Sequence, residues 1–251
     1  MKNFFVLGVL AFVFSISSCT KDSEDKQESG KLKFNVVLTD GVKPVNQNEV
    51  ISLSNGQEIN VSLFRLYFSN ISLSQFDAST ELLIKDVALL DPGVDGSNSF
   101  TVELDGATFS SIKFGLGVDA IQNDQNPGDF PNEHPLSTYQ SMYWSMLKYR
   151  FAKFEGKGNL DGQLGSTSDV AIAFHPGTNP LYKKLVLPVN VTIKEGTTST
   201  VNINININEI FAGNNPFDLT DGSETQTHST ASDIQIAEKF MENLKTSITI
   251  N

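Results

Sequence analysis

The sequence predicts an all-β protein, an antiparallel β-sandwich of about nine strands with one C-terminal amphipathic helix. Short runs in which apolar and polar residues alternate recur along the chain, and turn-forming residues separate them. The clearest run spans residues 201–208, with Val or Ile at each odd position and Asn at each even one. Such alternation gives a strand one buried face and one polar face. Several strands at this short spacing favour two packed antiparallel sheets.

Further strands are expected before that run. The second of them, residues 59–76, is long enough for one bent strand or for two strands that meet near Ser69-Asn70. Asp91-Pro92-Gly93 ends the third with turn-forming residues, and Asp105-Gly106 separates the fourth from the fifth. The expected strands are residues 32–38, 59–76, 81–90, 100–104, 111–118, 148–155, 169–174 and 184–194.

Three segments depart from the strand pattern. Residues 119–135 contain three prolines and no periodicity, which is typical of a long and often functional loop. Residues 138–147 predict a short helix in which Met142 and Met146 share a face. Residues 232–246 predict an amphipathic helix that could cover one end or edge of the β core. Ser232 would be its N-cap, and its apolar face would comprise Ile236, Ala237, Phe240, Met241 and Leu244.

Composition excludes several classes of protein. The net charge is −11 and the pI is about 4.7, so the chain lacks the basic surface that nucleic acid binding needs. Hydrophobic residues make up 39% of the chain, which suffices for a core. No nucleophile elbow, phosphate-binding glycine loop or catalytic cysteine stands out, so we expect a protein that is not an enzyme. We also expect a monomer.

The N-terminus resembles a bacterial lipoprotein leader. Residues 1–18 combine a charged start, a short apolar run and a small-residue end, as in a signal peptide. Ile16-Ser17-Ser18-Cys19 resembles a lipobox, in which the cysteine becomes the lipidated first residue; a coincidental cysteine is the alternative. Cys19 is the only cysteine, so no intramolecular disulfide can form. Residues 19–31 then form a flexible acidic tether, and residues 32–251 form one domain.

Histidine and tryptophan are scarce in this chain and mark a candidate metal site. His134 ends the long loop, His175 follows a strand candidate, and Trp144, the only tryptophan, lies between them in sequence. Imidazoles suit copper, zinc or nickel, and thioethers such as those of Met142 and Met146 would favour Cu(I). Neither histidine fits a local zinc motif, and histidines on the surface or satisfied in the core are the alternative interpretation.

Taken together, these motifs resemble the MbnP-like family of periplasmic and surface copper-binding proteins. The matching pieces occur in the family's order and cover most of the chain from about residue 30 onward. Relatives often carry a second tryptophan and a glycine after the Trp-Ser pair, where this chain has Met146 and Lys148. The pieces are Tyr67-Phe68-Ser69-Asn70-Ile71, Leu116-Gly117-Val118-Asp119, His134-Pro135, Met142-Tyr143-Trp144-Ser145, Phe151-Ala152-Lys153-Phe154-Glu155-Gly156 and Phe174-His175-Pro176-Gly177.

The resemblance implies a β-sandwich that binds copper, as Cu(I) or Cu(II), through histidines. At the matching positions, His134 and His175 would be the ligands, and His228 is a third candidate. Trp144 would be the residue oxidised to kynurenine, whose carbonyl and aryl amine are donors that an indole lacks. The family's usual oxidant for that step is a di-haem peroxidase-like partner.

We therefore expect a copper-binding protein that serves copper acquisition or storage. Cys19 would anchor it to the bacterial outer membrane, on the periplasmic side or at the cell surface. A metal-free adhesion or interaction module is the alternative, favoured if the histidines lie far apart or are buried against carbonyl groups.

Overall fold

The computed structural model describes residues 29–76, 81–159, 161, 163–165 and 169–251. Cys19, the predicted leader and most of the predicted tether lie outside these described residues. Within them, no helix combines the length and the apolar character that crossing a membrane requires.

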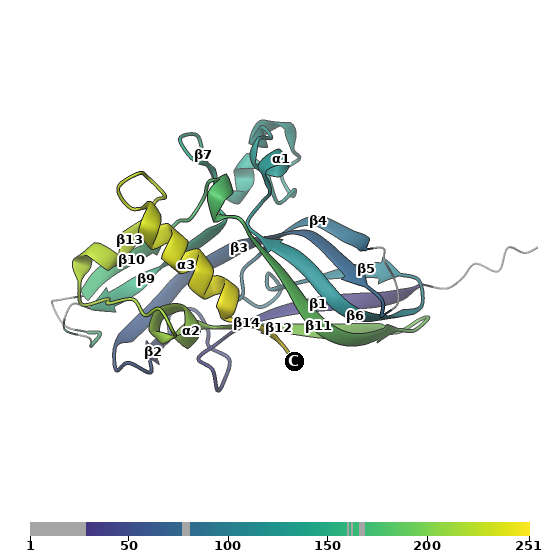
Figure 1. The fold of residues 1–251 in the computed structure, drawn as a ribbon, viewed down its shortest axis with the longest axis horizontal. Helices are drawn as coiled ribbons and strands as arrows, with labels where there is room; N and C mark the ends of the chain where they lie inside the picture. The colour runs from purple at the N-terminus through teal and green to yellow at the C-terminus, as the bar shows by residue number, and fades with distance from the viewer. Residues whose placement is uncertain (1–28, 77–80, 160, 162, 166–168) are drawn as a thin grey trace, which may run out of the picture.

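Two β-sheets build the described part of the molecule and pack around an apolar core (Figure 1). The smaller sheet has four strands in the order β14-β12-β1-β5. The larger sheet has eight, with the order β11-β6-β3-β9-β10-β13 and with β2 and β4 also paired to β3. A separate two-stranded hairpin is formed by β7 and β8.

The strands are β1 (Gly30–Thr39), β2 (Val50–Ser52), β3 (Glu58–Ser74), β4 (Leu82–Leu90), β5 (Ser99–Leu104), β6 (Ala107–Leu116), β7 (Tyr143–Trp144), β8 (Lys148–Tyr149), β9 (Ala152–Asn159), β10 (Asp169–Phe174), β11 (Lys183–Ile193), β12 (Thr198–Asn206), β13 (Gln226–Thr227) and β14 (Ile248–Ile250). The α-helices are α1 (Ala120–Asn123), α2 (Ile207–Ala212) and α3 (Ile234–Thr246).

The predicted all-β sandwich fold is confirmed, with more strands than the sequence indicated. Fourteen strands lie in the described residues, against about nine expected. The additional ones, β2, β7, β8, β13 and β14, have two or three residues each, too few for alternation to be visible. Most neighbouring strands are antiparallel, but β1 and β12, and likewise β10 and β13, are parallel pairs.

β3 is one long, bent strand, which is one of the two arrangements expected. Its first half pairs with β2 and β9, and its second half pairs with β4 and β6. Asn70 has a left-handed φ of 50°, and the registers with β4 and β6 shift beside it. Asparagine tolerates this conformation better than most residues. The Asn70 amide donates to the Asp119 carboxylate at 2.9 Å, which ties the bend to the long loop.

β12 shows the predicted alternation but ends two residues early. Val201, Ile203 and Ile205 are buried, whereas Asn202 faces solvent. The strand stops at Asn206, whose side chain accepts the N–H of residue 208 at 3.0 Å and caps α2. A side chain that accepts a backbone N–H of the first turn stabilises the start of a helix. The last two residues of the alternating run, 207 and 208, therefore belong to α2.

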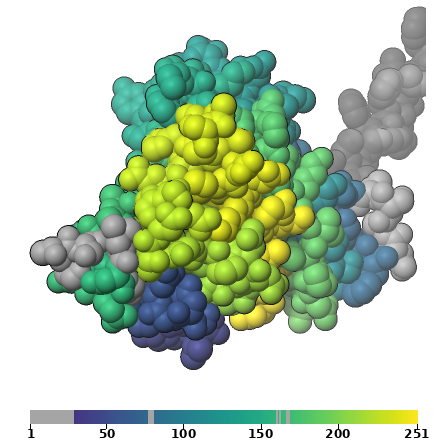
Figure 2. Space-filling view, turned by 60° about the vertical axis from the view of Figure 1, so that its left-hand side comes forward, coloured from purple at the N-terminus to yellow at the C-terminus, as the bar shows by residue number. Residues whose placement is uncertain are grey.

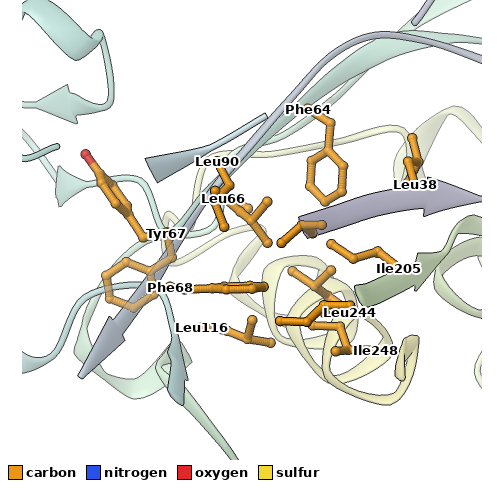
Figure 3. Close-up of a cluster of buried hydrophobic side chains, with 14 of the residues drawn as sticks. Leu38, Phe64, Leu66, Tyr67, Phe68, Leu90, Leu116, Ile205, Leu244 and Ile248 are labelled. Atoms are coloured by element: carbon orange, nitrogen blue, oxygen red, sulfur yellow. The ribbon is translucent and has the colours of Figure 1, made fainter. Parts of the chain in front are cut away.

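α3 closes one side of the core, as its amphipathic pattern predicts. The side chains at positions 237, 240, 241 and 244 are fully buried. Phe240 stacks on Phe174 of β10, with ring centroids 5.1 Å apart. Figure 3 shows Leu244 in one apolar cluster with Phe68 of β3 and Ile205 of β12. The N-cap of the helix is residue 233, one residue later than expected. In Figure 2 the helix, coloured yellow, covers much of the visible face.

The short helix predicted for residues 138–147 is wrong. These residues, all of them described, form one 3-10 turn and then enter β7. Ser141 has a left-handed φ of 58°, and the Met142 carbonyl accepts the backbone N–H of Arg150 at 2.9 Å, as in a hairpin. Met142 is buried, whereas Met146 is 69% exposed at the hairpin turn, so the two methionines share no face.

Candidate metal centre

His175 and His228 lie side by side because two parallel strands end together. Phe174 of β10 and Thr227 of β13 are partners in the register, and the histidines are the next residue on each strand. The backbone N–H of His175 donates to the backbone carbonyl of Thr227 at 2.9 Å. The Ser229 hydroxyl donates to the backbone carbonyl of His175 at 3.4 Å. The two imidazole rings are perpendicular, with centroids 5.1 Å apart. Backbone pairing therefore holds the two rings together.

Trp144 reaches the same place from a third segment. It lies in β7, where the register pairs it with Lys148 of β8. Its ring meets the ring of His228 edge to face, with centroids 5.9 Å apart and an interplanar angle of 72°. Two side chains fix the hairpin: Lys148 pairs with the Asp124 carboxylate after α1, and the Arg150 guanidinium donates to two main-chain carbonyls before β7. The only tryptophan of the chain thus lies beside His228, which in turn contacts His175.

A carboxylate and an ammonium group complete the surroundings of His175. Glu155 lies on β9, and its Oε1 is 3.0 Å from His175 Nε2 and 3.1 Å from Lys153 Nζ. The side chain of His175 is only 9% exposed. Burial, and then the positive charge of Arg150, lowers the pKa of His175 from 6.5 to about 4, against the opposing effect of Glu155. The imidazole is therefore neutral at pH 7 and keeps a lone pair that a metal ion can use.

His134 occupies a different position. Its ring stacks on Phe130 with centroids 4.2 Å apart, and its Nδ1 accepts the backbone N–H of Leu136 at 3.1 Å. A neutral imidazole that accepts at Nδ1 carries its proton on Nε2, so it has no free lone pair. Among the ring contacts of the described residues, none joins His134 to either of the other histidines. To bind a metal ion, His134 would have to give up its hydrogen bond to Leu136.

The donor set of this centre is small. Within the described residues, no group of three His, Cys, Asp or Glu side chains is arranged to hold a metal ion. The thioether of Met142 is buried in the core, and that of Met146 is exposed at the hairpin turn. The His175 and His228 imidazoles are the nitrogen donors that lie together. Two imidazoles suit copper and leave coordination positions for further ligands.

Sequence reasoning missed the two charged residues at this centre. Lys153 and Glu155 are alternate residues of β9, so they share one face of the sheet. Glu155 is paired with Ala173 in the register of β9 and β10, which places His175 on that same face. The alternation on either side of Phe154 shows in the sequence that Lys153 and Glu155 share a face of a strand. It does not show that this face lies next to His175, because that depends on which strand pairs with β9. The pairing that brings His228 to His175 depends on β13, which is two residues long.

Comparisons with known proteins agree on one family. A family model described as MbnP matches residues 28–231 of this chain. Among solved structures, MbnP from Methylosinus trichosporium is similar, with 14% sequence identity and a TM-score of 0.58. The similarity covers 89% of this chain and 99% of that one, so it concerns the whole fold. No curated protein sequence matches.

Proposed function

This chain belongs to the MbnP family, and from that premise we propose that it is an extracytoplasmic copper-binding protein whose ligands include His175 and His228. One observation carries the proposal. Two of the three histidines and the only tryptophan converge from three distant segments, with ring centroids 5.1 and 5.9 Å apart. The role that we propose is copper acquisition or storage, without catalysis.

The residues present fit copper. His175 is buried and neutral, and His228 lies half-buried beside it, so one donor is sheltered while the other is reachable from solvent. Neutral imidazole binds both Cu(I) and Cu(II). Backbone hydrogen bonds on both strands position the histidines, so little conformational freedom is lost when a metal ion binds.

Trp144 is the residue that we propose for oxidation to kynurenine. Its contact with His228 would place the carbonyl and aryl amine of kynurenine next to an imidazole donor. Trp144 is half-buried, and its strand β7 belongs to a segment that projects from the sheets in Figure 1, which favours access by an oxidising partner. A di-haem peroxidase-like protein is the partner that we propose for this step.

His134 receives a different role in this proposal from that of His175. Its Nδ1 holds the backbone of Leu136, and its ring packs on Phe130, so both contacts order the end of the long loop. We assign it to loop structure and assign the second imidazole ligand to His228. Lipidation of Cys19 would tether the domain to the outer membrane.

A metal-free interaction module is the second candidate. The observation that favours it is the hydrogen bond between His175 and Glu155, which satisfies one ring nitrogen without a metal ion. In that case the histidine pair would be structural, and the protein would act through its surface.

Copper titration of single-residue variants tests the first proposal. The full chain with Cys19→Ala, which avoids lipidation, would be titrated with Cu(I) and Cu(II) alongside His175→Ala, His228→Ala and His134→Ala. We expect loss of about tenfold or more in affinity for the first two variants and little change for His134→Ala, since only the first two remove a ligand. Unchanged affinity in both His175→Ala and His228→Ala would refute the site and support the metal-free module.

A further inference from the structure

Glu155 makes a hydrogen bond that decides which nitrogen of His175 carries the proton. Its Oε1 lies 3.0 Å from His175 Nε2. The same oxygen lies 3.1 Å from the Lys153 ammonium group. The positive charge of this ammonium group, in contact with the oxygen, favours the ionised form of Glu155. Glu155 is therefore a carboxylate, which can accept hydrogen bonds and cannot donate them.

The proton of the neutral His175 ring must then be on Nε2, because a carboxylate can be satisfied only by a donor. A neutral imidazole has one N–H and one lone pair, so the lone pair is on Nδ1. Copper needs an unprotonated nitrogen. The hydrogen bond to Glu155 thus leaves Nδ1 as the nitrogen that can bind the metal.

Glu155 is not itself placed as a metal ligand. In the described residues, no three His, Cys, Asp or Glu side chains are arranged to share a metal ion, although Glu155, His175 and His228 are neighbours. The Oε1 that faces His175 also accepts from Lys153, which reduces its capacity for a metal ion. Glu155 contacts one ring nitrogen of His175 and leaves the other for the metal ion. A carboxylate in this position commonly orients a metal-binding histidine.

The arrangement is built into rigid structure. Glu155 and Lys153 alternate on β9, and His175 follows β10, which pairs with β9 in an antiparallel register. The contact continues past the ends of β9 and β10, where the backbone N–H of Phe151 donates to the Pro176 carbonyl at 2.6 Å. A group on two paired strands is held more exactly than a group on a loop.

We propose that Glu155, supported by Lys153, is a positioning residue that fixes His175 in its Nε2–H form and selects Nδ1 as the copper ligand. This inference rests on the proposed function. Removing such an orienting carboxylate typically lowers metal affinity by about 10- to 100-fold.

The test begins with the metal-free protein, so it does not depend on copper. Long-range proton–nitrogen NMR of histidine-labelled full chain with Cys19→Ala at pH 7.5 identifies the protonated nitrogen of His175. We expect the proton on Nε2 in the otherwise wild-type chain and in Glu155→Gln, whose amide oxygen can still accept a hydrogen bond. We expect a mixture of both forms in Glu155→Ala. Glu238→Ala, which changes an exposed glutamate of α3, serves as the matched control.

Copper titration of the same four proteins completes the test. We expect Glu155→Ala to bind copper about 10- to 100-fold more weakly than the parent and Glu155→Gln to recover much of that loss, whereas Glu238→Ala stays unchanged. A proton on Nδ1 of His175 in the parent would overturn the inference, whether or not any variant folds. Unchanged affinity in folded Glu155→Ala would also overturn it. A parent chain that binds no copper would instead overturn the proposed function.

Discussion

Mild acid should destabilise the metal-free protein through His175. Burial and Arg150 lower the pKa of His175 from 6.5 to about 4 in the folded state. Between these two values, the unfolded chain takes up a proton that the folded protein does not bind. The contribution of neutral His175 to the free energy of unfolding is therefore complete above pH 6.5. It is lost progressively as the pH falls toward 4.

The magnitude follows from the size of the shift. A difference of about 2.5 in pKa corresponds to about 3 kcal/mol when the pH has fallen below both values. At pH 5, the linkage relation gives a loss of about 2 kcal/mol. Screening by solvent at the rim of the site reduces this value, so we expect about 1–2 kcal/mol.

The assay compares urea unfolding of the metal-free chain and of His175→Gln at pH 7.5 and pH 5.0. Glutamine retains an N–H donor for Glu155 but does not titrate. Groups away from this site titrate equally in both proteins, so the difference between their losses reports on His175 together with its partner Glu155. We expect the chain with His175 to lose about 1–2 kcal/mol more than the variant. Parallel losses in the two proteins would refute the argument that His175 is buried and neutral.

Three further predictions concern the core, the backbone and the anchor. Phe240→Ala should cost about 3–5 kcal/mol in urea unfolding because it removes a fully buried ring, and a cost below about 1 kcal/mol would contradict the packing. Gly117→Ala should destabilise the fold more than Gly56→Ala: both have positive φ, but a Cβ at Gly117 would lie 2.3 Å from the Phe151 ring and a Cβ at Gly56 would meet nothing within 4 Å. Equal costs would show that the ring moves freely. Cys19→Ala should remove the protein from the membrane fraction, and a variant that stays in that fraction would refute lipid anchoring.

The sequence predicted those strands and helices in which buried residues recur at the regular spacing of a strand or a helix. The run from Val201 alternates because β12 is a half-buried strand, and the spacing around Phe240 is helical because α3 covers the core on one face. The bend in β3 was also visible, since Asn70 interrupts a long apolar stretch with a residue that tolerates positive φ. Each of these signals is contained in the segment itself.

The remaining features depend on contacts between distant segments. Met142 and Met146 have helical spacing, but Arg150 pairs with the backbone of Met142 and makes the segment a hairpin. In the candidate site, sequence order suggested His134 and His175 equally, because spacing along the chain does not determine convergence in space. The partner of His175 became apparent only from the parallel pairing of β10 and β13.

Locating bound copper in a crystal tests the central claim most directly. Crystals of the copper-loaded chain would be measured on both sides of the copper absorption edge, and the anomalous difference map would show the metal position. We predict one peak about 2 Å from a nitrogen of His175 and from a nitrogen of His228, a distance typical of imidazole ligands. A peak at His134, or copper-loaded protein with no peak at the His175 and His228 pair, would contradict the account.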